Sequence, residues 1–321
     1  MNKTTVIYHS ADFDGIFCRE IARKFLPEAK LIGWNFEDAL IPYPDKGQVY
    51  VLDLSPDCFV SSSGMSLPDY AEAGVPVRMI WIDHHKSSIE KWSSTIPGYR
   101  IDGVAACRLA WQWFQCCDGN WPAPRSSAMA SAGVLPMKQD FINRTVNEPL
   151  AVRLAGEYDI WDKRDPNAEL FQHGLRSQEL TADVWERLLC DGIVPAESDM
   201  TVLELLSQGE CLQYAKTSEN ESIIKAAGFD LDFEGLHFLA CNHARYNSFL
   251  FTAGLKPEHD ACLGFAWRGG KWTVSMYHAP GKEHIDLSAI AVKHGGGGHR
   301  GACGFVCAEL PFKLNHQQLP D

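Results

Sequence analysis

Three short apolar runs in the N-terminal part of the chain each end in side chains that can bind a metal ion. The runs cover residues 5–8, 49–52 and 77–82, and the groups that follow them are His9, Asp53, and the triplet Asp83, His84 and His85. Apolar runs of this length are typical of buried parallel strands, whose carboxyl ends meet at one edge of an open α/β sheet. One such group alone would mean little, but three predict a single sheet that brings them together.

The segment from residue 4 to residue 26 predicts a strand, a polar turn and a helix. Apolar residues recur at helical spacing from Ile16 onward, so His9, Asp12 and Asp14 are expected on the turn. Carboxylates two positions apart on an irregular loop can diverge toward two neighbouring cations. Gly15 permits a sharp turn into the helix. The alternative is that an aspartate here only caps the helix N-terminus.

A further carboxylate is expected at the end of a helix that starts near Glu148. Asp159 lies among apolar neighbours and is the candidate, with Asp162 as the competing choice. The apolar helix predicted at residues 104–114 is expected to be core. Residues 118–138 lack periodicity and predict a loop or a partly ordered insertion.

The chain is expected to divide into three parts. Residues 1–180 predict a doubly wound, mainly parallel sheet, residues 181–228 a helical linker, and residues 229–321 a smaller α/β domain. In the last part, apolar runs on either side of Arg268-Gly269-Gly270-Lys271 predict a β-hairpin. A helix is expected over residues 286–294.

The run Gly295 to Gly298, followed by His299 and Arg300, is costly in backbone entropy, so a tight chain path or a close ligand is expected there. Its amides, with the two side chains, can hold an anion. A helix C-cap followed by a flexible turn would explain Gly295 only. A zinc site is the weaker alternative, with His294, His299, Cys303 and Cys307 as its four possible ligands. Cys303 and Cys307 alternate with small and apolar residues, as buried residues of a strand or helix do.

Composition restricts the partners and the compartment. The 321 residues suffice for two domains, no segment is apolar enough to span a membrane, and no signal pattern opens the chain. Eleven cysteines without a regular framework indicate reduced thiols, and hence a cytoplasmic protein. A net charge of −12 disfavours long nucleic acid, although metal ions and a few cations can hold a small anionic substrate.

The combined motifs resemble the DHH phosphoesterase superfamily, in the branch with a DHH-associated C-terminal domain. The matching elements are Asp12-Phe13-Asp14-Gly15, Asp53, Asp83-His84-His85, Asp159 and Gly296-Gly297-Gly298-His299. Within this branch, residues 275–277, 285–288 and 295–305 are most similar to the NrnB-like oligoribonucleases, or nanoRNases, which degrade very short RNA.

This resemblance implies a two-manganese centre. One ion would be held by His9, Asp12 and Asp53, and the other by Asp14, Asp53, His84 and Asp159. Asp83 would orient a ligand imidazole and His85 would face the scissile phosphate. The C-terminal domain would contact phosphate or sugar through His299, Arg300, the glycines Gly296, Gly297 and Gly298, and Asn242, Asn247 or Ser248.

The ligand chemistry agrees with the resemblance, since carboxylate and imidazole ligands without thiolate suit manganese, with magnesium as the other possibility. We therefore expect a manganese-dependent phosphodiesterase that hydrolyses short oligoribonucleotides to nucleoside monophosphates. A homodimer is also considered. The alternatives are a cyclic dinucleotide or pAp hydrolase, a single-strand DNA exonuclease, and an inactive nucleotide-binding module. Tyr277 stands where many cyclic-dinucleotide hydrolases of the superfamily have an arginine, which favours linear substrates.

Overall fold

The computed structural model describes residues 4–36, 38–43, 47–60, 79–92, 96–116, 135–190 and 196–313. The chain divides into two units, Met1–Glu210 and Cys211–Asp321. Most of the insertion predicted at residues 118–138 lies outside the described residues. None of the described helices is long and apolar enough to cross a membrane.

A five-stranded parallel sheet forms the centre of the first unit. Its strands, in spatial order, are β2 (Lys30–Trp34), β1 (Thr5–His9), β4 (Val49–Leu52), β6 (Met79–Asp83) and β7 (Gly98–Arg100). Every neighbouring pair is parallel. The predicted parallel sheet is confirmed, and β1, β4 and β6 end at His9, Leu52 and Asp83 along the same edge.

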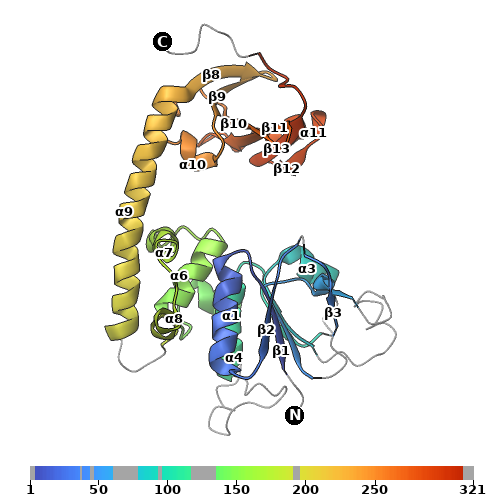
Figure 1. Cartoon of the computed structure of the whole chain (residues 1–321), viewed down its shortest axis with the longest axis vertical. Coiled ribbons are helices and arrows are strands. Elements are labelled where there is room, and N and C mark those ends of the chain that lie inside the picture. Colours follow the sequence, from blue (N-terminus) through green and yellow to red (C-terminus); the bar gives the residue numbers. More distant parts are fainter. Residues whose placement is uncertain are drawn as a thin grey trace. The chain divides into compact units, whose positions relative to one another are not determined.

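Both faces of this sheet are covered, which explains why its central strand β4 is apolar and buried at every position rather than at alternate ones. Val6 and Tyr50 belong to a core beneath the helices α1 (Phe13–Phe25), α4 (Ala106–Cys116) and α6 (Leu150–Asp159). Ile7 and Val51 point to the opposite core, where α3 (Lys86–Lys91) lies. Figure 1 shows α1 and α4 on one side of the strands and α3 on the other. The doubly wound architecture is therefore confirmed.

Shorter elements complete the first unit. They are the strand pair β3 (Ile41–Pro42) and β5 (Phe59–Val60), the 3-10 turn η1 (Pro56–Cys58), and the helices α5 (Lys138–Ile142), α7 (Asn167–Leu175) and α8 (Ala182–Leu188). The long helix α9 (Ala196–Ala227) follows. Val202 and Leu205 on α9 are fully buried in the core of the first unit, and the boundary between the units falls within this helix.

The second unit contains a six-stranded mixed sheet. Its strands, in spatial order, are β12 (Gly297–His299), β13 (Ala302–Cys307), β11 (Lys271–His278), β10 (Ala261–Arg268), β9 (Leu236–Asn242) and β8 (Gly228–Phe233), with helices α10 (Ser248–Phe251) and α11 (Leu287–Lys293). The predicted hairpin is confirmed as β10 and β11. Its turn residues Gly269 and Gly270 have φ angles of 56° and 83°, as a type I′ turn requires.

The second half of the glycine run lies in an edge strand, because Gly297 and Gly298 belong to β12. Gly295, with a φ of 78°, follows the end of α11, and β12 then pairs with β13. A Cβ on Gly296 would lie 2.1 Å from the carbonyl oxygen of Gly304, and one on Gly298 would lie 2.7 Å from Cα of Cys303. These glycines are therefore explained by the close approach of two backbones. The helix C-cap predicted at Gly295 and the tight chain path predicted for the run both have structural counterparts here.

Candidate metal centre

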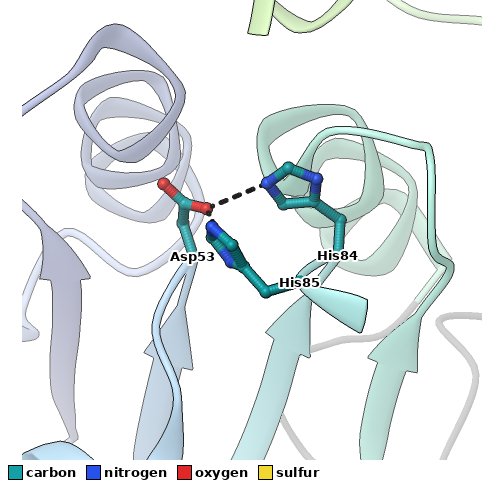
Figure 2. Close-up of side chains that lie close together, drawn as sticks. All are labelled: Asp53, His84 and His85. Carbon is teal, nitrogen blue, oxygen red and sulfur yellow. Dashed lines mark ion pairs between the residues drawn. The ribbon is translucent and has the colours of Figure 1, made fainter. Parts of the chain in front are cut away.

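Asp53 lies at the centre of a cluster of carboxylates and imidazoles at the carboxyl edge of the parallel sheet. Figure 2 shows its carboxylate at the end of β4 facing His84 and His85, which follow β6. Asp53 Oδ1 lies 3.4 Å from His84 Nε2 and 3.9 Å from His85 Nδ1. Two neighbouring parallel strands therefore place these three side chains together, as the sequence predicts.

The backbone of Asp53 is in the left-handed region, with a φ of 59°. Its amide still donates to the carbonyl of Ile82 at 2.9 Å, so the chain stays attached to β6 while it turns sharply at the strand end. Aspartate tolerates this conformation better than most residues. The turn directs the carboxylate inward, and Asp53 as a whole is only 2% exposed. Neither carboxylate oxygen takes part in a hydrogen bond with the described residues.

A first group of possible ligands consists of His9, Asp12 and Asp53. His9 Nδ1 lies 3.0 Å from Asp12 Oδ2 and 3.5 Å from Asp53 Oδ2, and His9 Nε2 is buried without a partner among the described residues. The other oxygen of Asp12 accepts from the amide of Gly15 and caps α1. Asp12 can therefore cap α1 with one oxygen and offer the other to a metal ion, so the two interpretations from the sequence do not exclude each other.

Gly15 is required because α1 begins directly above the end of β1. A Cβ at this position would lie 1.9 Å from the carbonyl oxygen of His9. The glycine predicted to allow a sharp turn into the helix therefore holds the ligand turn close to the strand end.

A second group consists of Asp14, His84 and Asp159. His84 Nε2 lies 3.7 Å from Asp14 Oδ2 and 3.3 Å from Asp159 Oδ2. Asp14 also accepts hydrogen bonds of 2.8 Å from the amides of Ala106 and Cys107 at the start of α4. The sequence gave no signal for this contact, because donor and acceptor are about ninety positions apart along the chain. It fixes the carboxylate before any ligand binds.

The structure favours Asp159 over Asp162 as the final carboxylate. Asp162 forms a 2.5 Å ion pair with Arg164, and the hydrogen bond from Arg164 lowers the pKa of Asp162. Asp159 closes α6 and faces His84 instead. Its burial raises its pKa to about 6.

The other ionisable groups are strongly perturbed by their mutual contacts. Contact with Asp12 and then with Asp53 raises the pKa of His9 to about 10. Burial disfavours the charged form of His84, but Asp53 and the neighbouring carboxylates outweigh it and raise the pKa of His84 to about 10. Burial raises the pKa of Asp14 well above its usual value. For Asp53, the adjacent imidazoles of His84 and His9 overcome burial and lower the pKa.

Asp83 contacts a different imidazole from the one that the resemblance implies. Its Oδ1 accepts from His85 Nδ1 at 2.7 Å and from the amides of His84 and His85 at 2.8 Å and 3.2 Å. The side chain of Asp83 is fully buried, whereas that of His85 is 43% exposed. Asp83 therefore orients His85, the imidazole expected at the phosphate, and not the ligand imidazole of His84.

The remaining candidate residues lie in the second unit. His299 is an exposed residue of β12, and Arg300 follows it and donates to the carbonyl of His284. Asn242 ends β9, Ser248 begins α10, and the side chain of Asn247 caps that helix. Gly296, Gly297 and Gly298 form the backbone path described above.

The zinc alternative has no support among the described residues, because no cluster of closely spaced ligands contains His294, His299, Cys303 or Cys307. His294 pairs with Glu234 and stacks on Phe305.

A cluster that the sequence did not indicate joins the β8–β9 hairpin to the segment before β10. It consists of Asp230 on β8, His237 on β9 and His259. The amide of Lys256 donates to His259 Nδ1 at 3.0 Å, so His259 Nε2 carries the hydrogen that it shares with Asp230 at 2.9 Å. Neither ring nitrogen of His259 therefore offers a lone pair to a metal ion. We interpret this cluster as a structural hydrogen-bond network.

The cluster around Asp53 fits divalent cations. An anionic side chain buried without hydrogen bonds is costly unless a positive charge compensates it, and His9 Nε2 beside it is also unpartnered. The donors are carboxylates and imidazoles, which suit manganese and magnesium. Asp53 belongs to one group of possible ligands with His9 and Asp12, and its Oδ1 lies 3.4 Å from His84 Nε2, which belongs to the group with Asp14 and Asp159.

No protein-family model and no curated protein matches the chain. Solved structures do match. The pGpG-specific phosphodiesterase PggH from Vibrio cholerae aligns over 95% of this chain and 93% of its own, at 13% identity and a TM-score of 0.42. Exonuclease RecJ bound to manganese aligns over 95% of this chain and 86% of its own, at 16% identity and a TM-score of 0.45. The DHH domain of a member of the s1p family of ribosomal proteins aligns over 95% of this chain and 82% of its own, at 12% identity and a TM-score of 0.47. Identities of this size leave the chemistry to be inferred from the side chains themselves.

Proposed function

We propose that the protein is a metal-dependent phosphodiesterase that hydrolyses short oligoribonucleotides to nucleoside monophosphates, with two manganese ions as cofactors. The observation that carries this proposal is the buried carboxylate of Asp53, which lies 3.5 Å from His9 Nδ1 and 3.4 Å from His84 Nε2 and has no hydrogen bond among the described residues. A carboxylate shared by two ligand groups is what two adjacent cations require as a bridge.

The two sites use ligands from both groups. His9, Asp12 and Asp53 would hold one ion, and Asp14, Asp53, His84 and Asp159 would hold the other. When bound, such a pair of ions activates a water molecule and neutralises charge on the phosphate. The protein contributes a rigid cage, because hydrogen bonds with α1 and α4 already hold Asp12 and Asp14.

His85 is the residue proposed to act on the substrate. Asp83 holds its Nδ1, which leaves Nε2 of this half-exposed ring available to a phosphate oxygen. From that position His85 would stabilise charge on the non-bridging oxygens or pass a proton to the departing oxygen.

The absence of thiolate from the cage supports manganese or magnesium over zinc. Cys18 and Cys107 are buried close to Asp14, and burial raises the pKa of each thiol well above its usual value. Neither sulfur belongs to a group of closely spaced possible ligands among the described residues.

The choice of short RNA rests on the resemblance of the motifs and on the net charge of −12, which disfavours long polyanions. We propose that His299 and Arg300, with Asn242 and Ser248, contribute substrate contacts from the second unit. Homodimer formation and a cytoplasmic location also remain proposals.

The experiment is a time course of products from a labelled RNA dinucleotide, a longer RNA and a cyclic dinucleotide, each with manganese and with magnesium. We expect the dinucleotide with manganese to be converted fastest, to nucleoside monophosphates. Faster turnover of the cyclic dinucleotide would favour the alternative substrate class. No hydrolysis of any phosphodiester with either ion would overturn the enzymatic proposal.

A further inference from the structure

An exposed tryptophan occupies a backbone position that normally favours glycine, directly beside the candidate metal centre. The helix α6 ends at Asp159, and the amides of Trp161 and Asp162 donate to the carbonyls of Tyr158 and Glu157 at 3.1 Å and 2.8 Å. These two bonds form a Schellman motif, in which the residue at the Trp161 position is left-handed. Its φ is 55°.

This placement is unfavourable twice over. A side chain with a Cβ costs roughly 1 kcal/mol in the left-handed region, where glycine costs nothing, and a bulky residue there is a true outlier. The indole is also 63% exposed, so burial does not compensate for the conformation. Strain of this kind, two residues from a candidate ligand, is a reason to examine what the exposed ring contacts.

The tryptophan is one end of a band of aromatic and cationic side chains that starts between two candidate ligands. Phe13 stands between Asp12 and Asp14, and the guanidinium of Arg176 lies 5.6 Å from its ring centroid. The same guanidinium lies 6.0 Å from the ring of Tyr158, which stacks on Trp161 with centroids 6.3 Å apart and planes 23° apart. Lys163 Nζ lies 4.5 Å from the Trp161 ring.

The chemistry of this band matches that of a nucleotide. A flat exposed ring backed by a second ring accepts a nucleobase by stacking, whatever its identity. Arg176 is exposed and forms no ion pair within the described part of the chain, so its charge is available to a phosphate. The ion pair of Asp162 with Arg164 holds the loop in place, which lowers the entropy lost on binding.

We propose that Trp161, stacked on Tyr158, is the binding surface for the base of the nucleotide whose phosphate lies at the metal centre, with Arg176 as the cation for a neighbouring phosphate. The inference rests on the proposed phosphodiesterase function and names a residue that selects substrates carrying a base. Such a surface makes turnover independent of base identity and dependent on the presence of a base.

The decisive variant is Trp161→Gly, because glycine relieves the backbone strain and preserves the Schellman motif while it removes the ring. We expect a thermal midpoint equal to or above that of the original protein, and a rise in KM for an RNA dinucleotide of about ten- to a hundredfold. Trp161→Phe should restore most of the loss. For a dinucleotide analogue that lacks the base, the original protein and Trp161→Gly should give the same kcat/KM.

The matched control is Trp267→Ala, which removes a tryptophan of similar exposure from the second unit. It should leave kcat/KM unchanged for both the dinucleotide and the analogue without a base. Equal KM values for the dinucleotide in the original protein and in Trp161→Gly would overturn the proposal. So would an equal loss on the dinucleotide and on the analogue without a base, because that pattern indicates only a disturbed Asp159.

Binding separates this inference from the proposed function. In calorimetric titrations with AMP in the presence of manganese, Trp161→Gly should bind about tenfold or more weakly than the original protein. Arg176→Gln should weaken binding of pAp, which carries a second phosphate, while leaving that of AMP unchanged. If the protein hydrolyses nothing yet shows these differences, the phosphodiesterase proposal fails and the nucleotide-binding surface stands. If AMP binds equally to the original protein and to Trp161→Gly, the surface itself is refuted.

Discussion

Asp53 combines an unusual backbone conformation with a buried charge that has no hydrogen bond among the described residues, and a substitution must separate the two. Asp53→Asn keeps the size of the side chain and the tolerance of a left-handed φ but removes the charge. We expect hydrolysis to fall by more than about 100-fold, the upper range for residues that act only through a ligand. Calorimetric titration with manganese should show fewer than two bound ions.

The same variant should unfold without metal below the midpoint of the original protein at neutral pH, since the lowered pKa of Asp53 means that His84 and His9 stabilise its charged form in the fold. Asp57→Asn is the matched control, because Asp57 lies on the same segment but forms an exposed ion pair with Lys91. Full activity and two bound ions in Asp53→Asn would contradict the proposed centre.

Asp83 should affect catalysis without affecting metal binding, because it contacts His85 and not the ligand His84. In Asp83→Asn, His85 loses its charged hydrogen-bond partner and its fixed orientation. We expect a 10- to 100-fold lower kcat, about the range for residues that orient an active group, with manganese stoichiometry unchanged. A loss of bound manganese equal to that in Asp53→Asn would instead support the role first inferred from the resemblance, the orientation of a ligand imidazole.

At the scale of elements, the contact between α7 and α9 depends on two glycines. A Cβ on Gly174 would lie 2.1 Å from the carbonyl oxygen of Leu205, and one on Gly209 would lie 1.9 Å from that of Leu170. Because the obstructing atoms are backbone atoms, they cannot rotate away. This contact explains why the first turns of α9 belong to the first unit.

We therefore expect Gly174→Ala to destabilise the protein by about 1–3 kcal/mol, the usual cost of overpacking, although alanine is the better helix former. Urea unfolding followed by circular dichroism measures the change. Gly297→Ala is the control, since a Cβ there meets nothing within 4 Å. A stabilised Gly174→Ala would mean that the two helices separate easily.

Strands and hairpins were predictable from the sequence because their signals are local. The apolar runs of β1, β4 and β6 and the Gly269-Gly270 turn each carry their own pattern. The strand β12 was not predicted, because a glycine run carries no apolar alternation, and its pairing with β13 appears only in the backbone. Strands without side-chain pattern escape reasoning from local sequence.

The same distinction holds for the candidate site. Residue types at strand ends predicted His9, Asp53 and His84, because parallel strands share an edge. The capping of α4 by Asp14 and the strain at Trp161 were not predicted, since both require the three-dimensional path of the chain. Asp159 and Asp162 could be separated only when the partner of Asp162 was known.

At the scale of the whole molecule, the possible metal ligands and the proposed phosphate contacts belong to different units. All six proposed ligands, from His9 to Asp159, lie in Met1–Glu210, whereas His299 and Arg300 lie in Cys211–Asp321. A substitution in the second unit should therefore alter substrate use and leave the metal ions bound. This division of roles is testable in the full-length protein.

His299→Ala removes an exposed side chain from an edge strand, so the fold should be retained. We expect KM for a short RNA to rise about tenfold, because one charge-assisted contact to phosphate contributes roughly 1.5 kcal/mol, while two manganese ions remain bound. Kinetics and metal analysis on the same sample measure both. His284→Ala is the control, since only its backbone carbonyl contacts Arg300. Loss of a tightly held ion in His299→Ala, with KM unchanged, would reverse the assignment and restore the zinc alternative for the second unit.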